Sequence, residues 1–332
     1  MSANIQCKIQ GSVAPGFESV KQLYEHNMRH LAEKATQLCI YHEGEKVVDL
    51  WATTEKEADF SPDNLINVFS SGKSLTAIAM ATLVGKGLLN YDDKITQHWP
   101  EFGGAGKDEL SVCDLMRHEA GLAAFNQSIK PEDLLTENIK TNVIGKLIEG
   151  HAQKFRKGDG RAREYHAVTR GWIANEIFRR VDPKDRTISE FLQEDISDPL
   201  EVDVVIGVKK DELNRVKKIS TLGLGFILLE SLKPKFRRKT EFNIFQILRK
   251  VISMLFIVRK STTIGSPPPF KGMKKIEFFN DPKVVMGETP SANANCSARG
   301  LAKIAAMMAA GGTWDEKEYF SSEAWAALHE GP

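Results

Sequence analysis

A serine and a lysine stand three positions apart, as Ser70 and Lys73, at the start of an apolar stretch with helical periodicity. Residues three apart on a helix lie on one face, so the hydroxyl and the amine are expected to be neighbours. Serine is a weak nucleophile until an adjacent base takes its proton. A partly desolvated lysine has a lowered pKa and can act as that base. The pair therefore predicts nucleophilic catalysis by Ser70 with Lys73 as its partner.

The Ser-x-x-Lys pattern also has an ordinary explanation, because both residues are common on protein surfaces and the motif counts only in its structural context. Here apolar residues recur through residues 75–84, which predicts a buried helix whose first turn reaches the surface. The letters Gly72-Lys73-Ser74 also match the end of a phosphate-binding loop. However, Asn67 stands where that loop requires glycine, which disfavours a nucleotide site.

Composition excludes several classes of function. The chain has 332 residues, 42% of them apolar, enough for a sizeable core in one large domain or two smaller ones. Its net charge of +1 gives no overall field that would attract nucleic acid. Four cysteines and eight histidines lie without metal-ligand spacing, so we expect no metal and no organic cofactor. No apolar signal core and no bilayer-length run is found, and we expect a cytoplasmic protein with reduced thiols.

Hydrophobic periodicity predicts many helices and a small amount of sheet. Two apolar runs, 37–41 and 46–52, surround Gly44 and predict a β-hairpin. Residues 89–102 show no clear period, and we expect an irregular, packed connection there. Helices are expected at 17–31, 70–85, 110–117, within 132–155, after Tyr165, within 187–207 before a loop, in the Ala-rich stretch that follows the loop at 291–297 and ends at Gly311-Gly312, and at 321–329.

Tyr165 directly precedes one of these helices, and with Ser70 and Lys73 it completes a pattern. From about residue 13 to its end, the chain resembles the serine β-lactamase family, and more closely its class C and penicillin-binding-protein-like esterase branch. The stretches that carry the resemblance are Val68-Phe-Ser-Ser-Gly-Lys-Ser, Gly87-Leu-Leu-Asn-Tyr-Asp-Asp-Lys-Ile, Leu115-Met-Arg-His-Glu-Ala-Gly-Leu, Tyr165-His-Ala-Val-Thr-Arg-Gly-Trp and Pro290-Ser-Ala-Asn.

The resemblance implies an α/β (α+β) fold of the β-lactamase/transpeptidase type, with an antiparallel sheet flanked by helices, a helical region, and the site between them. We therefore expect one domain over residues 1–332, with 209–280 as a variable, cap-like insertion. By the same resemblance, Ser70 would be the nucleophile, Lys73 its base partner and Tyr165 the proton relay to the leaving group. The expected reaction is hydrolysis of a small ester or amide through an acyl-enzyme, with the N–H of Ser70 as one oxyanion donor.

Two departures from the family pattern concern the substrate and the third motif. The class C tyrosine motif is Tyr-x-Asn, whereas this chain has Tyr165-His166-Ala167. The amide that would hold a β-lactam side chain is missing, a loss shared by esterase-like members, so we expect amide antibiotics to be poor substrates. The family also has a Lys-Thr-Gly or His-x-Gly motif on a strand after the Ala-rich helix, and this chain ends at Pro332, where we expect that strand to begin.

The letters His-x-Gly do occur, as His329-Glu330-Gly331, but we expect them at a helix end, just as His42-Glu43-Gly44 is expected at a hairpin turn. We therefore expect a C-terminally incomplete domain with half of its oxyanion hole missing. Losing one oxyanion donor costs about 10²–10³ in rate. This leaves an alternative open, a catalytically inactive relative with a binding or self-assembly role.

Residues 233–260 differ in character from the rest, because basic side chains alternate there with apolar ones. Such a basic amphipathic helix can lie on an anionic membrane surface. The favoured alternative is a cap helix that packs its apolar face on the body of the protein, since a basic face is usually just solvated. The sequence predicts no oligomeric state.

Overall fold

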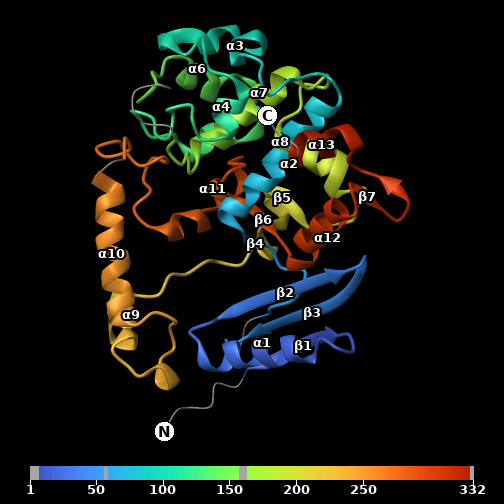
Figure 1. Ribbon diagram of the computed structural model, residues 1–332, viewed down its shortest axis with the longest axis vertical. Coiled ribbons are helices and arrows are strands. Elements are labelled where there is room, and N and C mark those ends of the chain that lie inside the picture. Colours follow the sequence, from blue (N-terminus) through green and yellow to red (C-terminus); the bar gives the residue numbers. More distant parts are fainter. Residues whose placement is uncertain (1–6, 56–58, 157–162, 260, 330–332) are drawn as a thin grey trace. The chain divides into compact units, whose positions relative to one another are not determined.

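The computed structural model describes residues 7–55, 59–156, 163–259 and 261–329. Its contacts divide the chain into two compact units (Figure 1). Unit 1 comprises Met1–Asn64, Ser220–Lys260 and Ser297–Ala306, and unit 2 comprises Leu65–Ile219, Ser261–Cys296 and Met307–Pro332. The 209–280 segment is divided between them, because residues 220–260 belong to unit 1 and both of its ends belong to unit 2.

Unit 1 contains a three-stranded antiparallel sheet in the order β1-β3-β2. Its strands are β1 (Lys8–Val13), β2 (Ala35–His42) and β3 (Glu45–Thr53). The connection between β2 and β3 has positive φ angles at Glu43 (51°) and Gly44 (82°), as the tight hairpin turns that match strand twist require. The predicted hairpin is therefore confirmed.

One face of this sheet packs against helix α1 (Glu18–His30), in agreement with the helix predicted at 17–31. Tyr24 and Met28 of α1 are buried together with alternate residues of β3, including Leu50. Asp49 lies between these apolar positions, where it accepts two hydrogen bonds from Arg299 Nε at 3.0 and 3.1 Å. Arg299 belongs to helix α12 (Ala298–Ala309), the predicted Ala-rich helix.

Unit 1 also contains the basic and apolar stretch that the sequence singled out. Within residues 233–260 the structure has a single 3₁₀ turn η6 (Lys235–Arg237) and helix α10 (Ile244–Arg259). Helix α9 (Leu224–Ser231) precedes this stretch and contacts α10. The backbone of Lys239, between η6 and α10, accepts a hydrogen bond of 3.0 Å from Ala32 N, which links this stretch to the residues before β2. Among the described residues, no helix has both the length and the apolar character needed to span a membrane.

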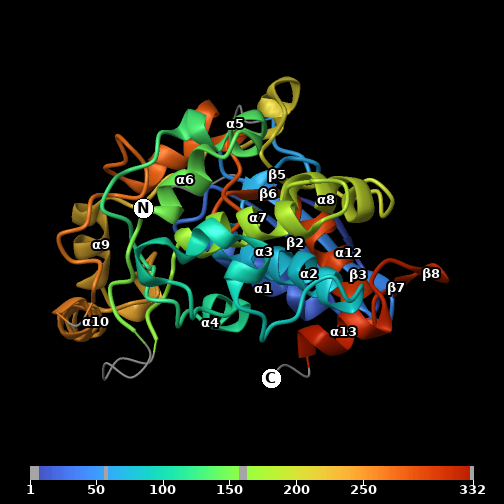
Figure 2. The same ribbon diagram turned by 90° about the horizontal axis from the view of Figure 1, so that it is seen from above.

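Unit 2 is built around helix α2 (Gly72–Gly85), which contacts α7, α8 and α13 (Figure 2). Buried side chains lie all around α2, as expected of a helix in the centre of a core. Other helical elements of unit 2 are η1 (Phe69–Ser71), α3 (Ile95–His98), η2 (Pro100–Gly106), α4 (Val112–Met116), η3 (Pro131–Leu134), α5 (Thr136–Lys140), α6 (Val143–Glu149), α7 (Thr169–Val181), α8 (Ile188–Phe191), η4 (Leu192–Ser197), η5 (Lys210–Arg215), η7 (Ile276–Asn280), α11 (Pro282–Met286) and α13 (Ser322–His329).

A second antiparallel sheet, in the order β4-β6-β5, lies within unit 2. It consists of β4 (Ile66–Asn67), β5 (Val204–Ile206) and β6 (Ala294–Cys296). A small hairpin follows α12, formed by β7 (Thr313–Trp314) and β8 (Lys317–Glu318).

The structure departs from the sequence prediction where elements are short. Two stretches predicted as loops, the end of 187–207 and residues 291–297, contain the strands β5 and β6. Residues 89–102, predicted to be irregular, contain α3 and the start of η2. Residues 132–155 hold several short helices. Two- to five-residue elements are too short to show a hydrophobic period. His329 ends α13, at the predicted helix end, whereas Glu330 and Gly331 lie outside the described residues.

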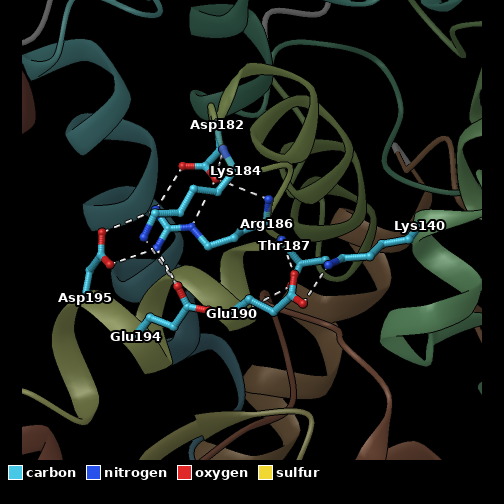
Figure 3. A network of polar contacts seen from close by, with 8 residues as sticks. All are labelled: Lys140, Asp182, Lys184, Arg186, Thr187, Glu190, Glu194 and Asp195. Carbon is cyan, nitrogen blue, oxygen red and sulfur yellow. Dashed lines mark hydrogen bonds and ion pairs between the residues drawn. The ribbon is translucent and has the colours of Figure 1, made fainter.

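A buried ionic network fixes the C-terminal end of α7 (Figure 3). The Arg186 guanidinium binds both carboxylate oxygens of Asp182 at 3.0 Å, and it also binds Asp195 at 2.8 Å and Glu194 at 3.0 Å. Only 7% of the Arg186 side chain and 3% of the Asp182 side chain are exposed. Thr187 follows directly and caps α8. The network thus joins the C-terminal end of α7 and the start of α8 to η4.

Replacing Arg186 by Met should destabilise unit 2, because Asp182 would remain buried without its cation. The expected loss in the free energy of unfolding is about 3–5 kcal/mol, measured by urea denaturation. As a matched control, Lys283→Met removes an exposed pair with Glu132 and should cost less than about 1 kcal/mol. Equal losses in the two variants would contradict the role assigned to the network.

Candidate active site

Ser70 lies at the surface in the turn that joins β4 to α2, within the 3₁₀ turn η1 (Phe69–Ser71). The ladder between β4 and β6 fixes the residues before it, since Asn67 pairs with Asn295. Asn67 Oδ1 then accepts a hydrogen bond of 2.7 Å from the backbone N–H of Phe69. Phe69 has a φ of 47°, a left-handed conformation that is uncommon for a bulky residue. The turn leaves Ser70 exposed at the surface.

Lys73 lies one turn further on, in the first turn of α2, and its amine contacts three oxygen atoms. Nζ donates to the backbone oxygens of Ala167 at 2.7 Å and Ser291 at 2.9 Å, and it lies 3.3 Å from Ser70 Oγ. Burial lowers the pKa of Lys73, helped by the charge of Arg170 and opposed by Tyr165. The amine is therefore held in place and partly desolvated, as a base requires.

Tyr165 approaches Ser70 from the segment that precedes α7. Its hydroxyl donates a hydrogen bond of 2.7 Å to Ser70 Oγ, although 53% of the residue is exposed. Its ring centroid lies 4.8 Å from Lys73 Nζ. Burial raises the pKa of Tyr165, but contacts with Lys73 and Ser70 and the charges of Lys73 and Arg170 outweigh it, so the net pKa is lowered. The structure thus brings together all three residues that the sequence singled out.

His166 is a residue whose role the sequence analysis missed. It is fully buried, its Nε2 accepts from Leu122 N at 2.9 Å, and its Nδ1 donates to Glu164 O at 2.6 Å. These two bonds require the neutral ring with its proton on Nδ1. Burial lowers the pKa of His166 to about 4, so the ring stays neutral near neutral pH. His166 therefore ties the Tyr165 segment to the segment around Leu122.

Arg170 and His118 form a further layer behind the lysine and the tyrosine. Arg170, from the first turn of α7, is buried and donates to the backbone oxygens of Lys73 at 3.3 Å and Met116 at 3.4 Å. His118 Nδ1 accepts from His166 N at 3.0 Å, and its ring lies 4.9 Å from that of Tyr165. Burial and the nearby Arg170 lower the pKa of His118 to about 3. Arg170 is thus a fixed positive charge beside a neutral histidine.

Two glycines allow the segment around Ser291 to reach the lysine. A Cβ atom at Gly171 would lie 2.5 Å from Ser291 N and Oγ, and one at Gly72 would lie 2.7 Å from Pro290 O. Any larger residue at either position would push this segment away. The glycines therefore set the approach that puts the Ser291 carbonyl within hydrogen-bonding distance of Lys73.

A cavity of about 280 Å³ adjoins the site at Ala167. This is the position where the Tyr-x-Asn pattern has asparagine, so the short methyl group leaves the space open. The walls are mainly apolar and come from three parts of unit 2. They are formed by Ala123, Ala124, Phe125, Gln127, Ala167, Val168, Thr169, Trp172, Thr263, Ser266, Pro267 and Pro269.

Known proteins are similar to this chain in sequence and in fold. Esterase/β-lactamase LipL of Mycobacterium tuberculosis is 30% identical over 203 residues, which are 59% of this chain and 44% of LipL. The chain therefore spans less than half of that relative's length. A penicillin-binding protein homologue from Caulobacter crescentus superposes with a TM-score of 0.72 at 28% identity, covering 96% of this chain and 76% of the homologue.

A family VIII carboxylesterase superposes with a TM-score of 0.73 at 25% identity over the same shares of the two chains, 96% and 76%. These superpositions confirm the predicted β-lactamase/transpeptidase-like α/β fold with antiparallel sheets and flanking helices. The sequence model of the Beta-lactamase family matches residues 20–329. This match covers most of the chain, and the protein belongs to the Beta-lactamase family.

Proposed function

We propose that the chain is a serine hydrolase that cleaves a small ester or amide through an acyl-enzyme on Ser70. One observation carries the proposal. Ser70 Oγ lies between the hydroxyl of Tyr165, at 2.7 Å, and the amine of Lys73, at 3.3 Å. A serine hydroxyl beside an amine with a lowered pKa can be activated as a nucleophile by that amine.

Lys73 is the proposed base for the attack by Ser70. A neutral amine has two N–H groups and one lone pair. The carbonyls of Ala167 and Ser291 can accept both N–H groups, which leaves the lone pair for the Ser70 hydroxyl. As Ser70 Oγ forms its bond to the substrate carbonyl carbon, the hydroxyl proton passes to Lys73 Nζ. The N–H of Ser70 is the proposed donor to the oxyanion that forms.

Tyr165 is the proposed route for the proton to the leaving group. When the bond between the carbonyl carbon and the leaving oxygen or nitrogen breaks, Tyr165 donates its proton to that atom and takes one from the ammonium of Lys73. A water molecule then attacks the acyl-enzyme, and its proton returns by the same residues to Ser70. The lowered pKa of Tyr165 suits this exchange, because a proton carrier works best with a pKa near the working pH.

The cavity beside Ala167 favours an ester with a small apolar group. Its aromatic walls at Phe125 and Trp172 offer apolar contact, whereas Ala167 offers no side-chain amide for a β-lactam. Two of the similar proteins bear the names esterase and carboxylesterase, which is consistent with this choice. We therefore rank carboxylic esters above amides as substrates.

Incubation with a fluorophosphonate probe should add a single adduct to the intact mass of the protein. The adduct should be absent from Ser70→Ala and present in the matched control Ser71→Ala. Lys73→Met should label more slowly by about 10²–10⁴-fold, because the general base is lost. The wild-type protein should also hydrolyse p-nitrophenyl acetate. A folded wild-type protein that forms no adduct would instead favour an inactive relative with a binding or self-assembly role.

The rate of labelling should rise with pH as Lys73 loses its proton, and the charge of Arg170 should lower the midpoint of that rise. The positive charge of Arg170 lowers the pKa of both Lys73 and Tyr165. Arg170→Gln removes that charge, so both pKa values should increase and the midpoint should move to higher pH. The pH profile of labelling, measured on protein whose circular dichroism is unchanged, tests this shift.

Arg163→Gln is the matched control for the pH profile. Arg163 is exposed, lies two residues before Tyr165 and pairs with Glu119 at 3.0 Å. Its removal should leave the midpoint where it is. Profiles with the same midpoint in Arg170→Gln and in the wild-type protein would rule out the electrostatic role of Arg170.

A further inference from the structure

Most of the large apolar side chains that the described residues expose lie in one stretch, from Leu222 to Phe256. We call residues 222–259 the basic–apolar segment. It includes α9 and α10, and it exposes aromatic rings that a solvated surface rarely carries, with Phe245 at 77% and Phe256 at 64% exposure. An exposed apolar patch of this extent marks an interaction site.

Helix α10 separates its apolar and polar side chains around its axis. At 100° per residue, Phe245, Leu248, Ile252, Leu255 and Phe256 fall on one side, and all five are exposed. The other side carries Gln246, Lys250 and Ser253. Arg249 lies at the border beside Phe256, and Arg259, the last residue of the helix, falls on the apolar side. Ile244 and Ile247, at the edge of the apolar side, are half-buried. Among the α10 side chains whose exposure the structure describes, those that pack therefore lie at one edge of the apolar side.

The basic–apolar segment also concentrates positive charge. It contains eight basic and two acidic residues, whereas the whole chain has a net charge of +1, so the rest of the chain is net negative. One of the two acids, Glu230, is already engaged, because it pairs with Lys233 and accepts a hydrogen bond of 2.8 Å from Lys239 N. Lys250 Nζ lies 3.4 Å from the centre of the Phe242 ring. Cations therefore border the apolar side chains.

We propose that the basic–apolar segment binds the surface of membranes that contain anionic lipid, with α10 lying in the plane of the interface. Its 16 residues span only about 24 Å and include Arg249, Lys250 and Arg259, which suits a helix on the surface rather than across the bilayer. A second copy of the same segment could cover the apolar side chains, but it would bring no excess of negative charge to pair with the basic residues. Anionic headgroups above an apolar layer match both features.

The segment is continuous in sequence with residues of the candidate site. Shortly after α10 ends, Thr262 N donates a hydrogen bond of 2.8 Å to Glu164, the residue before Tyr165. Ser261 Oγ also donates to Glu164, at 2.5 Å, and residues 263–269 contribute to the cavity at Ala167. The residues that directly follow the basic–apolar segment in sequence therefore contact the residue before the proposed proton relay. The proposal itself does not rest on hydrolase activity.

Sedimentation of the full chain with vesicles tests the proposal. Vesicles of equal parts phosphatidylcholine and phosphatidylglycerol should bind the protein, and vesicles of phosphatidylcholine alone should bind it at least about tenfold more weakly. Phe245→Glu with Phe256→Glu should weaken binding by more than about tenfold, because both rings would leave the apolar layer. Arg249→Gln with Lys250→Gln should weaken it by about fivefold per removed charge.

Leu23→Glu is the matched control, because Leu23 is 62% exposed on α1 and lies outside the basic–apolar segment. This variant should bind vesicles like the wild-type protein. Unchanged urea unfolding would show that the variants are folded. The proposal would be overturned if the wild-type protein did not bind anionic vesicles. It would also be overturned if the variant with Phe245→Glu and Phe256→Glu bound them equally well. A third outcome would also overturn the proposal: light scattering shows that the wild-type protein is a dimer and this variant a monomer, and neither protein binds vesicles.

Discussion

The three contacts of the Lys73 amine are the constraint on which the rest of the candidate site depends. They join three stretches that are far apart in sequence: the turn at Ser70, the segment at Ala167 and the segment at Ser291. An amine that burial has partly removed from water needs polar partners in its place. Each stretch must therefore be held within hydrogen-bonding distance of one nitrogen atom, and much of unit 2 serves this purpose.

Different devices hold the three stretches. The ladder between β4 and β6 fixes the residues before Ser70, the buried ring of His166 fixes the segment that includes Tyr165 and Ala167, and the missing side chains of Gly72 and Gly171 admit Ser291. The helices of unit 2 hold these stretches in position. Helix α2 is enclosed by its neighbours, and α7 carries Arg170 at one end and the Arg186 network at the other.

The sequence predicted the parts of this arrangement that are local. The hairpin and the helices α1, α2, α7 and α12 have periods long enough to read, and Ser70, Lys73 and Tyr165 belong to motifs of a few residues. The roles of His166, Arg170 and the Ser291 carbonyl could not be predicted in this way. Each depends on contacts across about 40 to more than 200 residues, and a backbone carbonyl leaves no mark in the residue type.

The backbone and the side chain of Ala167 have different roles. Its carbonyl oxygen binds the amine of Lys73, whereas its methyl group belongs to the wall of the cavity. Every residue type has the same carbonyl, so a new side chain at this position alters the shape of the cavity without removing the lysine's partner. Evolution, or a protein engineer, can therefore vary what such a site accepts while its proton-transfer geometry is inherited unchanged.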